Sequence, residues 1–319
     1  MESSDIDLII EKYKNEELDY THLINLLISL IQTSDDRNIR SQSINLLKEF
    51  DAFNMNLFKF IENLIISEAD CFIKRKAINI LGKYYKKFAL KPLKWAIKYE
   101  RDYDCLISLI KALIKIEDRE IKEFLILELR EKINQNKEEI NNIGIQKYNY
   151  AIQQLYQKEI IRNFNPIQIA NILISYITIS ELIKRFYSVY YELDQKTCLP
   201  IKLDLSDIEF EVRGWKSEFK NEIRKISDIT GLNNLQSLEF LDLSNNLIQD
   251  IQKLSKLKNL KYLFLSNNKI KNIENITFLK KIKSLQYLDI SGNNIAQSIN
   301  NKQINNKVEI KVHNLNYFR

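Results

Sequence analysis

Leu241-Asp-Leu-Ser-Asn-Asn-Leu-Ile248 is the first of three copies of one pattern, and the other two are Leu263-Phe-Leu-Ser-Asn-Asn-Lys-Ile270 and Leu288-Asp-Ile-Ser-Gly-Asn-Asn-Ile295. Each copy is preceded by another leucine, at position 238, 260 or 285, so the copies start 22 and 25 residues apart. The full pattern is L-x-x-L-x-L-x-x-N-x-I. Self-similarity at such a spacing predicts stacked repeats, because one unit this short cannot bury its own apolar side chains.

The spacing inside each copy predicts its shape. The L-x-L segment alternates with period two, as a short strand does, so its leucines face inward and the residues between them face outward. The asparagine then turns the chain, and its buried amide can bond backbone groups that the turn leaves unpaired. Stacked copies would align these amides in an asparagine ladder of Asn246, Asn268 and Asn293.

Between the strands, apolar residues recur every three positions, which favours 3₁₀ or short helical segments on the convex side. In the 22-residue copy they are Ile248, Ile251, Leu254, Leu257 and Leu260. The 25-residue copy keeps the same triplets and inserts one more, which leaves the predicted strands in register.

This pattern resembles that of leucine-rich-repeat proteins, over about residues 201–295. The 22-residue form with L-x-L-S-x-N-x-I is similar to the repeats of the type-1 protein phosphatase regulatory subunit, and Leu241-Asp-Leu-Ser-Asn-Asn and Leu263-Phe-Leu-Ser-Asn-Asn carry the likeness. Members of this class share architecture more than partners. The resemblance implies protein binding on the concave face and nothing narrower.

The repeats extend beyond the three complete copies. Ile201-Lys-Leu-Asp-Leu-Ser206 matches Phe240-Leu-Asp-Leu-Ser244 at its last four residues, but Ile208 replaces the asparagine, so it is interpreted as a degenerate first repeat followed by an insertion, mostly 211–224. At the other end, Val308, Ile310 and Val312 alternate like a last strand. Residues 300–319 are therefore expected to form a C-terminal cap that covers the open end of the solenoid.

Residues 1–195 are predicted to be helical, with apolar positions recurring at three and four. Asp36, Asp70 and Asp102 each precede a helical pattern, at offsets of 34 and 32 residues, where an aspartate can cap the helix N-terminus. Over about residues 20–135 this resembles a HEAT or armadillo array of antiparallel helix pairs; the alternative is an irregular helical bundle. The predicted fold is an α-helical, HEAT/ARM-like solenoid domain over 1–195, followed by a short α/β leucine-rich-repeat domain over 196–319.

Composition indicates a globular chain, because 45% of the 319 residues are hydrophobic and 28% are charged. Cys71, Cys105 and Cys198 lie far apart without a C-x-x-C motif, and are expected to be buried thiols in a reducing compartment. The start, Met1-Glu-Ser-Ser-Asp5, is acidic and unlike a signal peptide. The expected localisation is cytoplasmic.

One uncharged stretch, residues 163–180, is close to the shortest length of a membrane span. It contains Pro166 and several polar side chains, among them Asn165, Gln168 and Asn171. The favoured interpretation is a buried helix at the domain junction, with no membrane span, and a membrane segment is the alternative.

Catalysis finds little support in the sequence. The five glycines are isolated, so no phosphate-binding glycine loop exists, and His22 and His313 are the only histidines available for a triad or a histidine-rich metal site. No hydrolase, zinc-protease or kinase motif occurs. The chain is therefore predicted to be no enzyme, with no catalytic, cofactor-binding or metal-binding residues.

The residues that flank the strand leucines form the first candidate site. Equivalent outward positions stack sideways in a solenoid, which places an aromatic row beside a second row of mixed character. Exposed aromatic side chains in a row are typical anchors of protein interfaces, although aromatics also favour strands and the row could be covered by the chain itself. The candidate protein-binding residues are Phe240, Asp242, Tyr262, Phe264, Tyr287 and Asp289.

Charge marks a second candidate. Residues 71–99 hold nine basic residues and no acidic one, with Tyr84, Tyr85, Trp95 and Tyr99 interleaved, a combination that can bind nucleic acid or an acidic membrane surface. The proposed anion-binding stripe, within 74–98, puts Lys76, Lys83 and Lys87 on one helix face and Lys91, Lys94 and Lys98 on another. The competing and favoured interpretation is that glutamates on the next helices neutralise it, namely Glu117, Glu120, Glu123, Glu128 and Glu131.

Together these patterns predict a non-enzymatic intracellular adaptor, or scaffold, that binds a protein partner on the concave repeat face; a regulatory partner is an expectation by family analogy only. The alternative is a helical-repeat protein associated with nucleic acid through the basic stripe. The two differ in their salt response, because phosphate contacts make binding fall steeply with salt.

Overall fold

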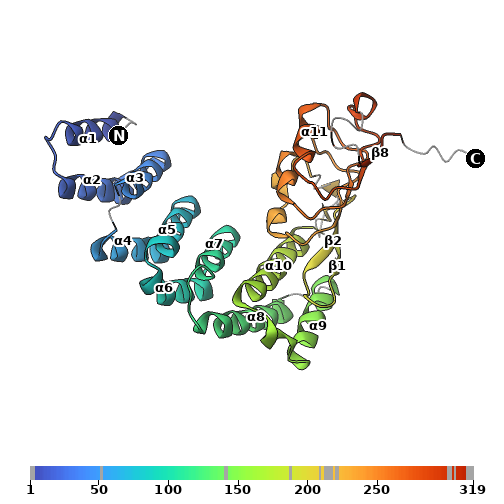
Figure 1. Ribbon diagram of the computed structural model, residues 1–319, viewed down its shortest axis with the longest axis horizontal. Coiled ribbons are helices and arrows are strands. Elements are labelled where there is room, and N and C mark those ends of the chain that lie inside the picture. The colour runs from blue at the N-terminus through green and yellow to red at the C-terminus, as the bar shows by residue number, and fades with distance from the viewer. Residues whose placement is uncertain are drawn as a thin grey trace, which may run out of the picture. The chain divides into compact units, whose positions relative to one another are not determined.

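The computed structural model describes residues 4–50, 53–139, 143–186, 189–207, 210–211, 218–219, 223–299, 304 and 307–313. Helices come first along the chain, and a small sheet with short connecting helices follows (Figure 1). The chain forms two compact units, Met1–Leu125 and Ile126–Arg319.

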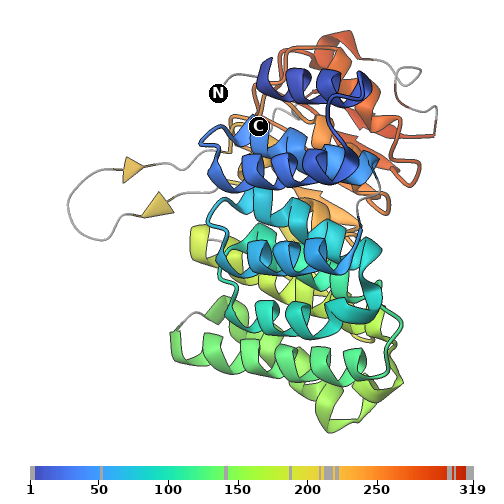
Figure 2. The ribbon, with the colours of Figure 1, turned by 90° about the vertical axis from the view of Figure 1, so that its left-hand side faces the viewer.

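The first unit consists of helices that pack in pairs. Helix α2 packs on α3, α4 on α5 and α6 on α7, while α3, α5 and α7 also contact one another in turn along the layers visible in Figure 2. The helices are α1 (Ser4–Lys14), α2 (Tyr20–Thr33), α3 (Arg37–Glu49), α4 (Met55–Ser67), α5 (Cys71–Tyr84), α6 (Lys86–Tyr99), α7 (Tyr103–Leu113) and the first residues of α8 (Glu120–Glu139).

The three aspartates expected to cap helices do so. The Asp36 side chain accepts the backbone N–H of Asn38 at 2.6 Å before α3, and that of Asp70 accepts the N–H of Phe72 at 2.8 Å before α5. Asp102 accepts the N–H of Cys105 at 2.9 Å before α7. Each carboxylate satisfies an N–H group that the first helical turn leaves without a partner, and each complements the helix dipole.

Close packing between α5 and α7 depends on a glycine. A Cβ added to Gly82 would lie 2.8 Å from the Cβ of Ala112, which leaves no room for a side chain. Glycine lowers helix stability, so its presence inside α5 is explained by this close approach of the two helices.

The second unit begins within α8 and continues through α9 (Ile143–Gln157), a 3₁₀ turn η1 (Ile160–Asn163) and α10 (Pro166–Arg185). Its six-stranded sheet has the order β1-β2-β5-β6-β7-β8, and every neighbouring pair in it except β1 with β2 is parallel. The strands are β1 (Tyr190–Leu193), β2 (Pro200–Asp204), β5 (Phe240–Asp242), β6 (Tyr262–Phe264), β7 (Tyr287–Asp289) and β8 (Glu309–Lys311). A separate hairpin pairs β3 (Phe210–Glu211) with β4 (Glu218–Phe219) inside the insertion.

Two sequence expectations about repeat ends are met. β2 pairs in parallel with β5, Leu203 opposite Leu241, as a first repeat should, and β8 pairs with β7 as the last strand. Ile208, and most of residues 300–319 of the expected cap, lie outside the described residues.

The expectation of helix throughout residues 136–195 is wrong at its end, because β1 is a strand. β1 pairs antiparallel with β2, Tyr191 opposite Leu203, so it covers the edge that the first repeat would otherwise leave unpaired. Helix α10 also contacts the 3₁₀ turn η3 (Leu232–Asn234). These contacts explain why the compact units divide at 125/126, within α8, whereas the sequence places the domain boundary at 195/196.

Helix α10 contains the uncharged stretch. It is long and apolar enough to cross a membrane by length and composition, but 72% of its apolar window is buried inside the protein. Its Tyr176 side chain has protein partners: the Asn136 amide donates to the Tyr176 hydroxyl at 3.0 Å, and that hydroxyl donates to the side-chain Oδ1 of Asn149 at 2.8 Å. Tyr176 is fully buried. The burial matches the expected buried helix.

The convex side carries the expected short helices. The 22-residue copy forms a 3₁₀ turn, η4 (Gln252–Lys256), between its strands, whereas the 25-residue copy forms a short α-helix, α11 (Glu274–Leu279). Three further short 3₁₀ turns are η2 (Ile226–Asp228), η3 and η5 (Ala296–Ser298). The extra triplet therefore appears as a wider convex turn, while β6 and β7 stay in register.

Candidate functional site: the concave face of the sheet

Buried asparagines hold the strands at a constant spacing. Asn268 donates through Nδ2 to the carbonyl oxygens of Leu243 at 2.8 Å and Leu265 at 3.1 Å, and its Oδ1 accepts the N–H of Ile248 at 2.9 Å. Asn293 repeats this one copy later, and Asn246 reaches back to Leu205 of the degenerate repeat at 2.9 Å. The predicted asparagine ladder is confirmed.

A second amide bridge on the convex side was not predicted. The Oδ1 of Asn275 accepts the N–H of Ile251 at 3.1 Å, and its Nδ2 donates to the carbonyl oxygen of Gln249 at 3.0 Å. Asn275 lies in α11 of the longer copy, and η4 of the shorter copy has no asparagine, so no repeated pattern could have marked it.

Strand register brings the predicted outward residues together in two rows. Phe240 lies opposite Tyr262, which lies opposite Tyr287, while Leu241, Leu263 and Leu288 between the rows are fully buried. The second row is Asp242, Phe264 and Asp289. Four further residues extend the rows at their ends, namely Lys202 and Asp204 on β2 and Glu309 and Lys311 on β8.

The aromatic side chains of the two rows contact one another. The Phe264 ring centroid lies 4.9 Å from that of Phe240 and 5.3 Å from that of Tyr287. Tyr262 remains 41% exposed, so this part of the row is open to solvent. The Lys202 ammonium sits 4.7 Å from the Phe240 ring centroid, in cation–π contact at one end of the cluster. We call Phe240, Tyr262, Phe264 and Tyr287 the aromatic cluster.

Three aspartate carboxylates lie along the second row. Asp204 and Asp242 lie opposite each other on β2 and β5, and each accepts the N–H of the serine two residues on, at 2.9 and 2.8 Å. Burial raises the pKa of Asp242, and the negative charges of Asp204 and Asp289 add to this. Asp289 pairs with Lys311 at 3.0 Å, whereas no cation among the described residues lies within ion-pair distance of Asp204 or Asp242.

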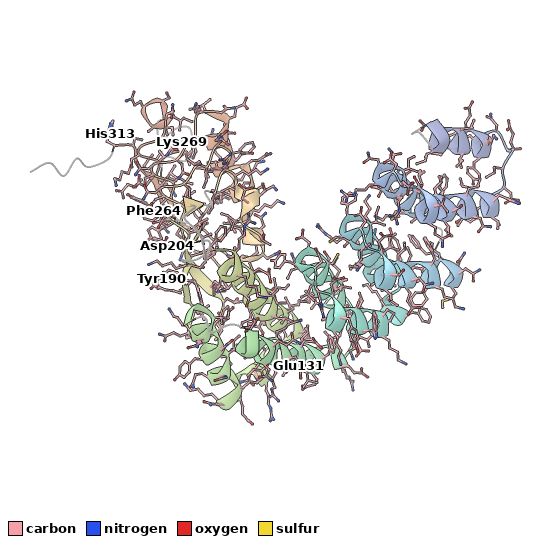
Figure 3. All side chains as sticks on the ribbon, turned by 180° about the vertical axis from the view of Figure 1, so that it is seen from behind. Glu131, Tyr190, Asp204, Phe264, Lys269 and His313 are labelled. Atoms are coloured by element: carbon pink, nitrogen blue, oxygen red, sulfur yellow. The ribbon has the colours of Figure 1, made fainter. Side chains whose placement is uncertain are left out.

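Sequence reasoning missed Lys202 and Asp204 as members of this face. The signal was present, because Ile201-Lys-Leu-Asp-Leu-Ser206 aligns with the first complete copy and so places Lys202 beside Phe240 and Asp204 beside Asp242. Tyr190, Asp204 and Phe264, which are labelled in Figure 3, come from β1, β2 and β6 of this sheet.

The basic stripe does not form as predicted. Helix α5 ends at Tyr84 and α6 begins at Lys86, so Lys87 belongs to α6 and cannot share a helix face with Lys76 and Lys83. The chain turns at Tyr85, whose side chain is buried and whose hydroxyl donates to the Asn54 carbonyl oxygen at 2.9 Å. The Lys87 side chain lies outside the described part of the structure.

Several of these cations are engaged within the first unit. Lys94 pairs with Glu120 at 2.6 Å, one of the expected neutralising contacts. Lys76 donates to the Asn45 side chain at 2.9 Å, and burial together with the nearby Lys48 lowers its pKa. Neighbours in the segment pair too, Lys74 with Glu100 at 3.0 Å and Arg75 with Asp104 at 3.5 Å, while Lys83, Lys91 and Lys98 are exposed.

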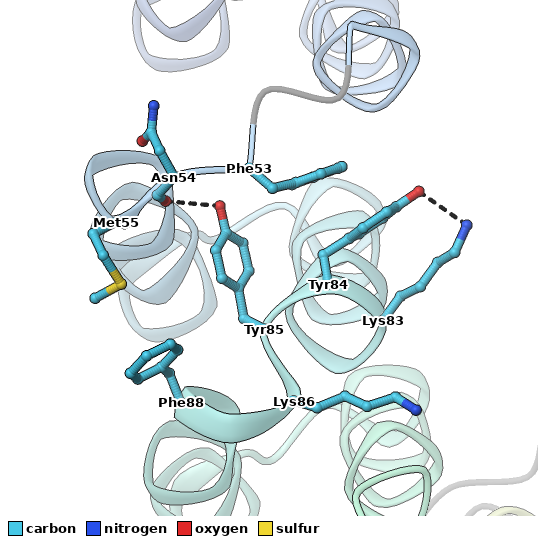
Figure 4. A pocket seen from close by; sticks show the side chains of 8 residues that line it. All are labelled: Phe53, Asn54, Met55, Lys83, Tyr84, Tyr85, Lys86 and Phe88. Carbon is cyan, nitrogen blue, oxygen red and sulfur yellow. Dashed lines mark hydrogen bonds between the residues drawn. The ribbon is translucent and has the colours of Figure 1, made fainter.

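An open hollow of about 430 Å³ lies at the junction of α5 and α6 (Figure 4). Among its lining residues, the Phe53 and Tyr84 rings stack on each other with centroids 3.6 Å apart, and Lys83 donates to the Tyr84 hydroxyl at 2.9 Å. The remaining lining residues are Asn54, Met55, Tyr85, Lys86 and Phe88. The hollow is aromatic and edged by two lysines.

One group of potential metal ligands occurs within the described ranges. The side chains of Cys71, Asp102 and Cys105 lie close enough together to share an ion. They belong to the first unit and have no part in the concave face.

The comparison with protein families agrees with the strand repeats. Residues 236–277 and 258–306 match the family of leucine rich repeats (2 copies). A comparison with curated proteins found no match. The second unit therefore contains leucine-rich repeats, a class whose members commonly mediate protein–protein interaction.

Proposed function

We propose that the protein is a non-enzymatic adaptor that binds a protein partner on the concave face of its leucine-rich repeats. The observation that carries this is the aromatic cluster, in which register and ring contacts bring Phe240, Tyr262, Phe264 and Tyr287 side by side while Tyr262 stays open to solvent. Interfaces draw most of their energy from a few such anchors near the centre of the contact.

The charges beside the cluster define the partner further. Asp204 and Asp242 lie next to each other without a described cation, and this proximity of two carboxylates is unfavourable until a positive charge arrives. The expected partner segment therefore presents an apolar or aromatic side chain for the cluster and a lysine or arginine for the two carboxylates. Charge complementarity of this kind gives specificity and register.

The finer class rests on resemblance. The 22-residue copies are similar to those of the type-1 phosphatase regulator, and a regulatory partner is proposed on that basis alone. The helix pairs of the first unit, with α3 packed on α5 and α5 on α7, support a HEAT-like array that would offer a second surface for scaffold assembly. We place the protein in the cytoplasm, where free cysteines such as Cys71, Cys105 and Cys198 are usual.

Nucleic-acid binding by the first unit is the second candidate, and the hollow at the junction of α5 and α6 is the observation in its favour. Stacked aromatic rings beside Lys83 and Lys86 could hold a base and a phosphate. Retention on immobilised RNA that falls steeply with salt, and that Lys83→Glu with Lys86→Glu abolishes, would support this candidate. Retention that is weak and unchanged by these substitutions would exclude it.

A site-specific photo-crosslinking experiment tests the adaptor proposal. A photoreactive residue replaces Tyr262 on the concave face or Ile273, which is 40% exposed in the longer convex turn, and crosslinked proteins from the native cell are identified. The proposal predicts a protein captured from position 262 and not from 273. Capture of the same proteins from both positions would overturn it.

Binding of the captured protein is then measured with purified variants. Tyr262→Ala with Phe264→Ala should weaken binding by at least about 30-fold, as loss of central anchors does. Ile273→Ala is the matched control and should bind like the original chain. Asp204→Asn with Asp242→Asn should also weaken binding, and by less at high salt. Full binding by both double variants would move the site away from the concave face.

A further inference from the structure

Successive helix pairs of the first unit contact each other at equivalent positions through different side-chain interactions. Arg37, the first residue of α3, pairs with Asp70, the aspartate that caps α5, at 2.5 Å. Cys71 is the first residue of α5 and meets Asp102, which caps α7, at 2.9 Å. An ion pair between α3 and the cap of α5 is therefore replaced, between α5 and the cap of α7, by a hydrogen bond from a thiol to a carboxylate.

A second thiol lies at the same contact between α5 and α7. The Sγ of Cys105, in the first turn of α7, lies 2.6 Å from the Sγ of Cys71. Non-bonded heavy atoms rest about 3.5–4.0 Å apart, so the two sulfur atoms are closer than ordinary packing places them. The Cys105 thiol also lies 3.6 Å from the carbonyl oxygen of Cys71, so this side chain reaches the backbone at the start of α5.

The distance between the two sulfur atoms distinguishes two roles for the cysteine pair, zinc binding and disulfide formation. Two thiolates on one tetrahedral zinc ion, with bonds of about 2.3 Å, lie about 3.7 Å apart, so an ion would have to push these sulfurs away from each other. A disulfide needs about 2.05 Å, a smaller change and in the direction of the existing approach. Asp102 could supply a third ligand, but the sulfur geometry favours a covalent bond.

We propose that Cys71 and Cys105 are a modification site, where a low-molecular-weight disulfide oxidises the pair to a reversible disulfide that links α5 to α7. Cys71 is partly exposed and Cys105 is buried, so Cys71 reacts first. Its thiol releases a proton to water, the thiolate attacks one sulfur of the small disulfide, and the other half leaves as a thiolate. Cys105 then loses its proton and attacks the Cys71 sulfur, which releases the second half. Two protein thiols and one small disulfide become one protein disulfide and two small thiols.

The surroundings of the two thiols make disulfide formation slow at neutral pH. Burial, together with the hydrogen bond to Asp102, raises the pKa of Cys71 to about 11, and burial also raises the pKa of Cys105. Because only the thiolate attacks, the rate of crosslinking should increase about tenfold for each unit of pH below that pKa. A surface thiol with its ordinary pKa would reach its full rate at lower pH.

The test uses the purified full chain, first stripped of metal with a chelator. It is incubated with glutathione disulfide at several pH values, quenched in acid, alkylated after unfolding and digested without reductant. Mass spectrometry should find a Cys71–Cys105 crosslinked peptide, formed faster at higher pH and lost with dithiothreitol. Cys198, which is buried in the second unit, serves as an internal control and should remain alkylated.

Three variants make the result decisive. Cys198→Ser should crosslink like the original chain, whereas Cys71→Ser and Cys105→Ser should form no intramolecular crosslink, with circular dichroism confirming that each is folded. The crosslink closes a loop of 34 residues and should raise the melting temperature of the first unit by about 5 °C or more.

Two outcomes would overturn the proposal. In one, Cys71 stops at a stable mixed disulfide, or links two chains, while Cys105 stays free in the folded protein. In the other, Zn²⁺ added to the chelator-treated chain binds at micromolar concentration in a Cys71-dependent manner, and without zinc no crosslink forms at any pH. The second result would make the cluster a metal site.

Discussion

The Oδ1 of Asn268 accepts the N–H of Ile248 at 2.9 Å, while the Nδ2 of the same side chain donates to Leu243 at 2.8 Å, so one amide joins two copies. Asn268→Ala would leave these buried groups unpaired, and the expected loss in unfolding free energy is about 1–3 kcal/mol. Denaturant titration measures it, with the exposed Asn294→Ala as control, which should change stability by less than about 0.5 kcal/mol. Equal stability of the two variants would contradict the ladder.

Leu263 and Phe264 are neighbours in β6 that lie on opposite faces. Leu263 is fully buried, so Leu263→Ala should destabilise the second unit by about 2–5 kcal/mol. Phe264 faces outward and is half-buried against Phe240 and Tyr287, so Phe264→Ala should cost clearly less. Chemical unfolding of both variants checks this order. If the Phe264 variant loses as much stability, the aromatic cluster is packed under another part of the chain and is not free for a partner.

Asp242 should make stability depend on pH. Burial raises its pKa in the folded chain, so the folded state binds the proton more tightly than the unfolded state does. This contribution is fully present below the unfolded value of 3.8 and is lost as pH rises through the raised pKa. Asp242→Asn should therefore raise the melting temperature at neutral pH, and the gain should vanish in acid. The exposed Glu309→Gln is the control, and an equal gain from it would assign the effect to net charge.

Tyr176 tests whether α10 is an interior helix. Its hydroxyl accepts from Asn136 and donates to Asn149, so Tyr176→Phe leaves two buried amide groups with fewer partners. The expected loss is about 1–3 kcal/mol, measured by thermal or chemical unfolding, with Tyr150→Phe on the exposed side of α9 as control.

We also expect the protein to stay in the supernatant after a high-salt wash of membranes. A protein that pellets stably, with a silent Tyr176→Phe substitution, would place α10 in a bilayer.

Much of the second unit could be predicted because its pattern is local and repeated. The leucines that face inward, the asparagines of the ladder and the 3₁₀ turns follow from spacings within one copy, and stacking of identical copies multiplies each signal. The helix caps at Asp36, Asp70 and Asp102 were equally accessible, since a cap involves residues two or three positions apart. Asn275 escaped because it occurs once.

What the sequence by itself determined is therefore the repeat: which side chains face the core, which face outward, and that Phe240, Tyr262 and Tyr287 must align. The tertiary structure alone decided how the helix pairs and the leucine-rich repeats end, and which side chains of neighbouring elements contact one another. The antiparallel β1 and the contact of α10 with η3 join segments that no periodicity relates, and the 2.6 Å approach of the Cys71 and Cys105 sulfurs depends on side-chain packing that a repeat spacing does not fix. Such contacts depend on where the chain turns, as Tyr85 shows by separating Lys87 from α5, and a turn that occurs once is set by packing with distant residues.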